Sequence, residues 1–452
     1  MAEKRPRNLL ELRPVAAVAS SRFYPVVLQW MAATVFALIL WQLLLGPENA
    51  HDNLGTALTW VIWWPLLPLV FLLFGRFWCA VCPFGWLSDQ VQRLVGVKRR
   101  TPRWLRSYGI WIIDACFLLI TWADYVFGIV DSPWGSGVLL LLMITAVVAS
   151  GAFFERRTFC RYLCFLGGLA GNYSRAGILA LRADESICAS CKSRAACFNG
   201  TPTSAPCPLF EFPRTMDSSA NCNLCAACIK SCPNGAITLE LRPPTKELWF
   251  IRKPKLAESF LAMAIMGIVL IQNLTMLELW ANLTAWVEAT SGVSSDALVF
   301  TVAFALAVVL PVALLWLAAA VSSRLAPGTL SQHFASFGYA LIALDVTAHL
   351  AHNLFHLLAE GKAVVYTTTT LLGGQETNAS AALVGTGTIE ILQWGLILLG
   401  GLGSLYTAYR IAQARTKASG GLWPLLAPSA TLIVTFTLLN LWLFTLPMAH
   451  RM

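Results

Sequence analysis

The sequence predicts an all-α polytopic membrane protein of about nine transmembrane helices, with a small ferredoxin-like dicluster module inserted between them. The composition is 57% hydrophobic and 12% charged, far from the roughly 25% charged residues of a soluble domain. Nine apolar stretches are about 20 residues long, which is enough to cross the hydrocarbon layer. Twelve of the 13 cysteines lie in short motifs, a pattern that indicates metal ligation more than a disulfide scaffold.

The predicted spans cover residues 25–46, 56–75, 108–128, 136–154, 257–280, 297–321, 331–358, 385–409 and 422–446. If the N-terminus is inside, the cytoplasmic segments are 1–24, 76–107, 155–256, 322–330 and 410–421. These segments hold 30 of the 32 lysines and arginines, and only Lys362 and Arg451 fall outside. This is the distribution that the positive-inside rule requires. The formal net charge of +9 is thereby explained by basic residues that collect on the cytoplasmic side of the membrane. The expected partner is membrane lipid, and we expect no nucleic-acid partner.

The first span is long and lacks a small-residue cleavage site, so the sequence predicts an uncleaved N-terminal anchor and no signal peptide. We expect three parts: an N-terminal membrane domain of four spans (1–182), a cytoplasmic ferredoxin-like module with two [4Fe–4S] clusters (183–245), and a C-terminal membrane domain of five spans (246–452). The expected location is a bacterial inner (cytoplasmic) membrane, with the N-terminus and the cysteine motifs in the cytoplasm.

The strongest motif is CNLCAACIKSCP at 222–233. It has the C-x2-C-x2-C-x3-C-P spacing of bacterial ferredoxins, in which three cysteines bind one cluster and the fourth binds the other. A second half with longer gaps lies upstream, at Cys188, Cys191, Cys197 and Cys207. We therefore expect one cluster on Cys188, Cys191, Cys197 and Cys232, and another on Cys222, Cys225, Cys228 and Cys207. Zinc ribbons also use paired C-x2-C units. The residues after the motif, 236–239, predict a short strand.

Two further cysteine pairs lie where predicted spans meet the cytoplasm: Cys79 with Cys82, and Cys160 with Cys164. Four thiols from two hairpins could converge there. Three interpretations remain open, namely a third iron–sulfur cluster, redox dithiols or buried structural thiols, and pairing favours the first two because it can lower thiolate pKa values. Cys116, alone in the third span, is expected to be a packing residue.

At these motifs, GRFWCAVCPFG and FCRYLCFLGG, followed by the dicluster segment, the chain resembles the membrane-bound polyferredoxins typified by NapH, NosR and CcoG. The resemblance covers about residues 56–240. It differs from the family pattern in a C-x2-C first pair and in Phe165, where the family has proline. The resemblance implies an electron-transfer subunit of the quinol dehydrogenase type.

The seventh predicted span carries a polar stripe. Asp345, His349, His352 and His356 follow one another at intervals of four, three and four residues, so they share one helix face. Asp124 and Glu390 are expected at a comparable depth, in the outer half of the bilayer. Ionisable groups in a span are costly and usually functional, and the stripe could serve a quinone, a haem b or a metal ion.

A bis-histidine haem is difficult to build on one helix face, because its two axial ligands approach from opposite sides. It would need His51, a second subunit, or a helix other than the one expected. His333 points nearly the opposite way from His349. Electrons that pass between an outer site and the cytoplasmic clusters would also have to cross much of a roughly 30 Å layer, so an intermediate carrier is expected.

The leading hypothesis is a membrane electron-transfer subunit of an oxidoreductase. It would exchange electrons between a quinone pool, or another membrane redox cofactor, and redox partner subunits. One alternative is a copper-handling or assembly reductase resembling CcoG, with copper at the histidine stripe. Another is a scaffold subunit of a respiratory complex. No nucleotide-binding glycine motif follows a strand, so we expect the protein to depend on partners.

Overall fold

The computed structural model describes residues 8–193, 195–374, 380–416 and 421–449. Within this part of the chain, nine helices or helical runs are long and apolar enough to cross a membrane, which confirms the predicted fold class and span count. They comprise Val26–Leu45, Leu54–Val95, Arg103–Phe127, Pro133–Phe153, Leu256–Thr275, Asp296–Leu325, Leu330–Ala359, Thr386–Thr416 and Trp423–Leu443. The protein is a multi-pass membrane protein.

The chain forms two compact units, each built from separate stretches of sequence. Unit 1 consists of residues 1–40, 69–113 and 139–247, and unit 2 of residues 41–68, 114–138 and 248–452. The twelve grouped cysteines all belong to unit 1, and the histidine stripe belongs to unit 2. The three-part division expected from sequence stays a prediction.

The first half of the chain contains the short helices and both strands. In chain order the elements are η1 (Leu9–Glu11), α1 (Arg13–Ser20), α2 (Val26–Leu45), η2 (Ala50–Asp52), α3 (Leu54–Thr56), η3 (Ala57–Trp63), α4 (Trp64–Phe74), η4 (Gly75–Phe77), α5 (Trp78–Val81), α6 (Pro83–Val95), α7 (Arg103–Phe127), α8 (Pro133–Phe153), α9 (Thr158–Tyr162), α10 (Phe165–Ala176), β1 (Leu179–Ala183), α11 (Glu185–Ala189), α12 (Ala196–Asn199), η5 (Pro213–Thr215), α13 (Ala227–Ser231), β2 (Ile237–Leu241) and η6 (Lys246–Phe250).

The second half is almost entirely helical. It contains α14 (Leu256–Thr275), α15 (Glu278–Ser291), α16 (Asp296–Leu325), α17 (Leu330–Ala359), α18 (Ala363–Leu371), α19 (Thr386–Thr416) and α20 (Trp423–Leu443).

The second span is longer and less regular than the predicted 56–75. It begins at Leu54 and continues through successive helical segments to Val95, with a π-helical stretch at η3. Gly75 has a φ of +58°, which costs a glycine little. This residue begins η4, where the helix kinks before α5. The kink separates the membrane-crossing part of the run from the part that carries the first cysteine pair.

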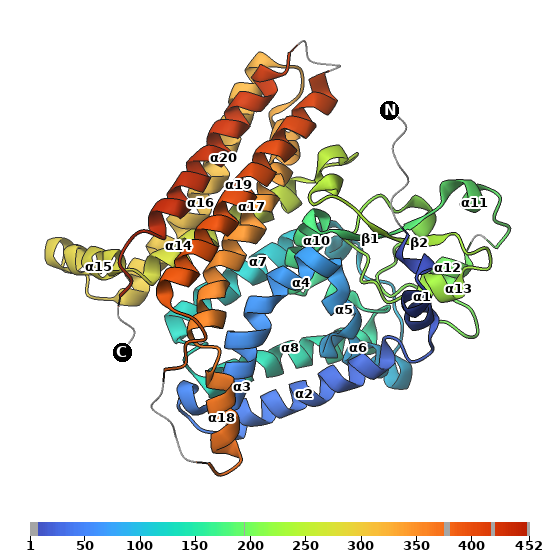
Figure 1. The fold of residues 1–452 in the computed structure, drawn as a ribbon, viewed down its shortest axis with the longest axis horizontal. Coiled ribbons are helices and arrows are strands. Elements are labelled where there is room, and N and C mark those ends of the chain that lie inside the picture. Colours follow the sequence, from blue (N-terminus) through green and yellow to red (C-terminus); the bar gives the residue numbers. More distant parts are fainter. Residues whose placement is uncertain (1–7, 194, 375–379, 417–420, 450–452) are drawn as a thin grey trace. The chain divides into compact units, whose positions relative to one another are not determined.

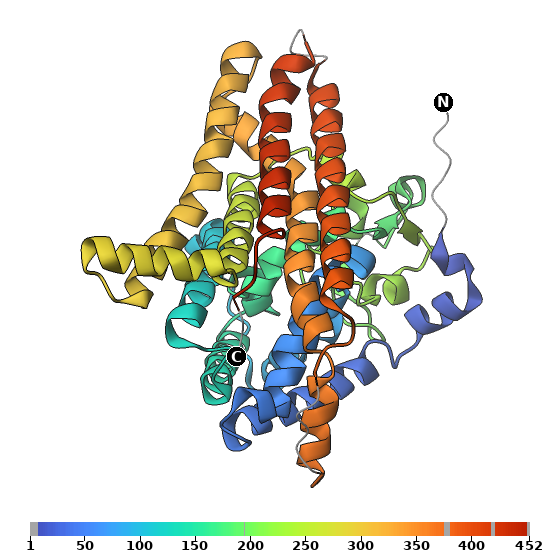
Figure 2. The ribbon, with the colours of Figure 1, turned by 60° about the vertical axis from the view of Figure 1, so that its left-hand side comes forward.

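In unit 2, α14, α16, α17, α19 and α20 pack into a bundle with α17 in contact with each of the other four (Figures 1 and 2). A capping box starts α17: the Thr329 hydroxyl accepts from Gln332 N–H, and the Gln332 side chain accepts from Thr329 N–H. Residues 337–353 of α17 are all buried. A helix that is buried on every face is the core of its bundle.

Polar contacts between the helices show their relative directions. Ser259 Oγ on α14 donates to the Ala335 carbonyl on α17 at 2.7 Å, and farther along the two helices Asn273 contacts His352. The two helices therefore run parallel. On α19, Gln393 Nε2 donates to the Ala351 carbonyl at 2.9 Å. Ser404, later on α19, accepts from Leu344 N–H, earlier on α17, so these two helices are antiparallel. These directions are those of alternating crossings.

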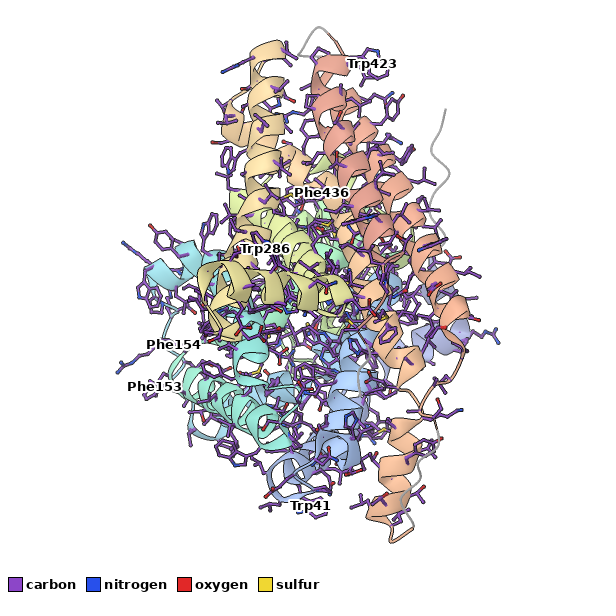
Figure 3. All side chains as sticks on the ribbon, turned by 90° about the vertical axis from the view of Figure 1, so that its left-hand side faces the viewer. Trp41, Phe153, Phe154, Trp286, Trp423 and Phe436 are labelled. Carbon is purple, nitrogen blue, oxygen red and sulfur yellow. The ribbon has the colours of Figure 1, made fainter. Side chains whose placement is uncertain are left out.

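Close helix packing in the bundle depends on small residues. A Cβ on Gly267 of α14 would lie 2.1 Å from the Ala307 carbonyl oxygen of α16, so only glycine fits there. Phe436 of α20 lies inside the bundle at 2% exposure, whereas Trp423 at the start of α20 is 72% exposed (Figure 3). The apolar exterior is the surface that lipid would cover.

The fifth span ends earlier than predicted. The expected stretch 257–280 was too long, because α14 ends at Thr275 and Glu278 starts the separate helix α15. Apolar residues continue past this break, so hydropathy alone could not reveal it.

The predicted strand at 236–239 is present as β2. It pairs antiparallel with β1, with Leu181 opposite Leu239. The two strands lie on either side of the eight cysteines of the dicluster segment in sequence (Figure 1). Leu181, Met216 and Ile237 form a small core against which Cys222, Cys228 and Cys232 pack.

Candidate functional site

The ferredoxin-like loop is folded around its cysteines. Leu224 and Ala226, which lie between cysteines of the motif, have φ values of +55° and +59°. The backbone N–H groups of Leu224 and Ala227 are hydrogen-bonded to the sulfurs of Cys222 and Cys225. Such N–H groups favour the anionic form of a sulfur ligand.

The structure groups the eight cysteines of this segment into two sets. Cys228 has Cys222, Cys225 and Cys207 as electrostatic neighbours, although Cys207 is far from the motif in sequence. Cys197 has Cys232, Cys188 and Cys191 as neighbours. These are the two sets that the motif spacing predicts for two clusters. Cys197 also neighbours Cys228, so the two sets adjoin.

The two span-end pairs come together as a third set. Cys164 has Cys160, Cys82 and Cys79 as electrostatic neighbours. Cys82 immediately precedes α6 and Cys164 immediately precedes α10, so each lies at the N-terminus of a helix of 12 or 13 residues. The helix dipole and the free N–H groups there favour a thiolate or an anionic cluster. Phe165 takes the first helical position that Pro83 takes in the other hairpin, so its difference from proline leaves the geometry intact.

Burial disfavours the deprotonated form of these thiols unless a positive charge lies close to them. Burial raises the pKa of Cys160 to about 12 and the pKa of Cys222 to about 12. It also raises the pKa of Cys207 and Cys225. Thiolates packed together in this way need cationic charge, which the irons of a cluster would supply. The donor set therefore fits iron–sulfur clusters.

Arg157 lies between the third set and the Cys225 loop. Its guanidinium is 3% exposed and makes a forked contact with Asp89, with Nη2 2.7 Å from Oδ2. Nη1 also donates to the Cys79 carbonyl at 2.9 Å. Cys160 and Cys225 are both electrostatic neighbours of this guanidinium, so the third set and the Cys225 set adjoin at this residue.

Two other contacts hold the Cys222 loop in place. Arg76 donates to the Ala220 carbonyl, and Glu247 accepts from Ser219 N–H at 2.8 Å. Glu247 also pairs with the buried Arg242. Buried charges that are paired and hydrogen-bonded in this way fix a loop in one position.

Among the described residues, no three histidine, cysteine, aspartate or glutamate side chains converge closely enough to share one metal ion. A zinc ion holds each thiolate about 2.3 Å from its centre. A four-iron cluster binds its four cysteines on four separate irons and so holds them farther apart.

A pocket of about 580 Å³ in unit 2 contains part of the histidine stripe. This size is typical of small-molecule sites. Its polar residues are Asn273, His352, Thr386, Glu390, Gln393 and Thr445. The remainder are apolar residues from the turn after α14, from α17 and α19, and from the end of α20 and the segment that follows it. The structure thereby brings together His352 and Glu390, two of the residues predicted from sequence.

An amide donor lines this pocket. Oδ1 of Asn273 lies 2.8 Å from Nδ1 of His352, and because an amide oxygen only accepts, Nδ1 carries the proton. Nε2 of a neutral His352 is then free of a proton. Nδ2 of Asn273 is buried and has no hydrogen-bond partner within the described residues. A buried unpaired donor in a pocket points to a ligand acceptor.

The other predicted stripe residues do not line this pocket. Asp345 and His349 are buried deeper in the bundle, with the His349 ring 5.9 Å from the Trp64 ring. His356 lies one turn beyond His352, with ring centroids 5.4 Å apart.

Asp124 accepts a hydrogen bond from Val130 N–H at 2.9 Å and closes the turn after α7. Cys116 is half-buried on α7.

Sequence reasoning missed several polar residues in the bundle. Asn273 and Gln393 are amides within long apolar spans, and a polar side chain in such a span is the signal that could have identified them. Glu258 accepts from the Tyr339 hydroxyl, and the buried Asp114 is an electrostatic neighbour of Glu258. Each of these contacts depends on helix packing, which a single sequence does not show.

The chain matches the family model of a 4Fe–4S binding domain over residues 56–102 and 136–181. The first segment carries Cys79 and Cys82, and the second carries Cys160 and Cys164. The match therefore lies on the span-end pairs and not on the dicluster motif.

Two relatives are similar over part of the chain. One is the "Putative electron transport protein YccM" of Escherichia coli, 25% identical over 39% of this chain and 54% of the relative. The other is an uncharacterized protein of Methanocaldococcus jannaschii, 26% identical over 36% of this chain and 64% of the relative. The chain thus covers between half and two thirds of the length of each of these curated relatives. No solved structure matches the chain significantly. Together, the family match and the first relative support an iron–sulfur electron-transfer role.

Proposed function

We propose that the protein exchanges electrons between a membrane quinone, bound in the pocket at Asn273 and His352, and iron–sulfur clusters held by its cysteines. The observation that carries this proposal is that the pocket holds both a hydrogen-bond donor and a proton acceptor. The Asn273 amide offers a donor for a quinone carbonyl, and Nε2 of His352 offers an acceptor for a quinol hydroxyl proton. The apolar lining, including Leu277, Phe355 and Ile389, suits a ring with an isoprenoid tail.

Three cysteine sets would hold three clusters. Cys188, Cys191, Cys197 and Cys232 would hold the first, Cys222, Cys225, Cys228 and Cys207 the second, and Cys79, Cys82, Cys160 and Cys164 the third. When bound, a [4Fe–4S] cluster takes up and releases single electrons. The sets adjoin one another in the order third, second, first, which supports a path through unit 1. The match of the 4Fe–4S family model to 56–102 and 136–181 supports a cluster over dithiols at the third set.

The proposed setting follows from the charge distribution. Lysine and arginine are concentrated in the segments that carry the cysteines, so we place the cysteine sets on the cytoplasmic side of a bacterial inner membrane. A redox partner would then meet the clusters there. This is the arrangement of a quinol dehydrogenase subunit of the NapH type.

The test uses the purified full-length chain with its clusters, prepared without oxygen. A short-chain quinol should reduce the clusters, and EPR should show the reduced signals. In Asn273→Leu, reduction at subsaturating quinol should be slower by roughly tenfold, the loss expected for one hydrogen bond to the ligand. Asn440→Leu is the matched control, because Asn440 is equally buried but does not line the pocket.

Clusters that dithionite reduces but quinols do not, with or without partner proteins, would overturn the proposal. Copper that copurifies with the protein and is lost in a His349→Ala, His352→Ala double variant would replace the proposed function with metal handling.

A further inference from the structure

We propose that His356 and Glu360 carry protons between the quinone pocket and the surface at the C-terminal end of α17. This inference rests on the proposed function and names the route by which the site gains or loses protons.

The route is a continuous line of titratable groups on one helix face. His352, His356 and Glu360 follow one another at intervals of four residues on α17 and at its C-cap, so they lie above one another along the helix. The ring centroids of His352 and His356 are 5.4 Å apart. Nδ1 of His356 lies 3.4 Å from Oε1 of Glu360.

Exposure increases steadily along this line. His352 is 7% exposed in the pocket wall, the His356 side chain is 19% exposed, and the Glu360 side chain is 35% exposed. Glu360 therefore has access to solvent at the helix end, whereas His352 does not. A buried proton acceptor needs such an intermediate, because an isolated charge in the membrane interior is costly.

The chemistry balances for a quinol. Its oxidation to a quinone releases two protons and two electrons, and the electrons leave singly to one-electron acceptors of the iron–sulfur class. A hydroxyl O–H of the quinol breaks, and Nε2 of His352 takes the proton while Nδ1–H stays bound to Asn273. The imidazolium passes the proton to His356, directly or through one bridging water. His356 passes it to the Glu360 carboxylate, which releases it to solvent. Each proton follows this route in turn, and quinone reduction runs the steps in reverse.

Neighbouring charged and polar groups define a competing route. Asn273 from α14 and Gln393 from α19 line the pocket with His352 but do not titrate. Glu390 from α19 also lines the pocket and is exposed, so it is the titratable group that could compete with His356 for the proton. On α17 itself, His349 and Asp345 lead in the other direction, toward the buried middle of the helix. A proton that left through them would move away from the helix end.

The test compares Glu360→Gln and His356→Gln with the wild-type holoprotein, using a short-chain quinol and a soluble electron acceptor. Neither residue lines the pocket, so quinone binding should be unchanged. Turnover should fall by roughly 100-fold, the usual effect of losing a proton-transfer group. Added imidazole should restore activity to His356→Gln, and the solvent deuterium isotope effect should increase in both variants. A merely structural role would produce neither result. Glu288→Gln, an exposed carboxylate on α15, is the matched control.

The outcomes separate this inference from the proposed function. A wild-type protein that neither binds nor oxidises quinol defeats the proposed function. A wild-type protein that turns over quinol, with Glu360→Gln and His356→Gln equally active, overturns only the proton route. The route is also overturned if Asp345→Asn slows turnover and Glu360→Gln does not.

Discussion

Oδ1 of Asn273 lies 2.8 Å from Nδ1 of His352 across the interface of the parallel helices α14 and α17. This hydrogen bond fixes the tautomer of the imidazole and leaves Nε2 without a proton. It also holds the Asn273 amide at the pocket, with its Nδ2 group buried. One contact thus prepares both the donor and the acceptor that a quinone requires.

Replacement of Asn273 by leucine should weaken quinone binding. The variant loses a donor to the ligand and leaves Nδ1–H of His352 without its acceptor, so we expect the Kd of a short-chain quinone to increase by about tenfold or more. Tryptophan fluorescence quenching by the quinone measures this, because Trp394 lines the pocket. If Asn440→Leu weakened quinone binding by the same factor, the effect would come from general loosening of the bundle and not from the pocket.

The cysteine sets make a prediction about which variants resemble each other. Cys207→Ser should lose the same EPR signal as Cys228→Ser, because these thiols are neighbours. Cys232→Ser should lose the signal that Cys188→Ser loses, although Cys232 belongs to the same short motif as Cys228. Iron content should fall by up to four atoms per chain in each case. If Cys232→Ser and Cys228→Ser affected one and the same signal, the exchange of the fourth cysteine between sets would be wrong.

Iron content can distinguish a cluster at the third set of cysteines from a pair of redox dithiols there. Cys82→Ser and Cys164→Ser remove thiols at two different helix N-termini, and each should abolish the same third signal while both other signals remain. Iron analysis together with thiol titration of the denatured protein checks this. Unchanged iron in both variants would exclude a third cluster and leave redox dithiols or buried structural thiols. Cys116→Ser serves as the control and should change neither quantity.

Arg157→Met should destabilise unit 1. The substitution leaves the Asp89 carboxylate, whose side chain is 29% exposed, without its forked partner. Because that carboxylate keeps access to solvent, we expect a cost of about 1–3 kcal/mol, below that of a fully buried pair. The apparent Tm in detergent, followed by intrinsic fluorescence, should fall by several degrees. Arg93→Met, on the exposed side of α6, should leave Tm within a degree or two. Similar Tm values for both variants would show that the pair contributes little.

Gly267→Ala should loosen the bundle of unit 2. Its Cβ would fall 2.1 Å from the Ala307 carbonyl oxygen, and backbone cannot move away as a side chain can. Overpacking of this kind costs about 1–3 kcal/mol. Gly395→Ala on α19 is the control, because nothing lies within 4 Å of its Cβ position. That variant should be neutral or gain up to about 1 kcal/mol from helix propensity. A Gly267→Ala protein as stable as the wild type would show that α14 and α16 can move apart freely.

Hydropathy was sufficient to predict the number and the approximate places of the spans. Spans such as 136–154 agree with the structure within a few residues, because each is a long apolar run between polar loops. The end of α14 at Thr275 was missed because the apolar residues continue into α15. The predicted second span starts within two residues of Leu54 and ends at the kink at Gly75, but hydropathy did not reveal that helical segments continue beyond this kink to Val95.

The candidate sites differed in how far the sequence could predict them. Cysteine spacing predicted the neighbours within the dicluster segment, because in the ferredoxin spacing the fourth cysteine of each half serves the other cluster. Helical periodicity placed His352 and His356 on one face, but it could not show that Asn273 from another span would meet His352. That contact depends on the parallel packing of α14 and α17. The expected role of Asp124 in the same site finds no support in its contact with Val130.

The burial of residues 337–353 of α17 also bears on how the protein is made. A segment with an aspartate and two histidines near its middle enters lipid poorly on its own, because a single central aspartate costs about 2.5–3.5 kcal/mol in membrane insertion. The neighbours α14 and α16 precede α17 in the chain, and α14 offers it polar partners at Ser259 and Asn273. During synthesis, α17 would therefore have to leave the translocon together with helices already inserted. The order of the spans along the chain thus serves as part of the assembly pathway of this bundle.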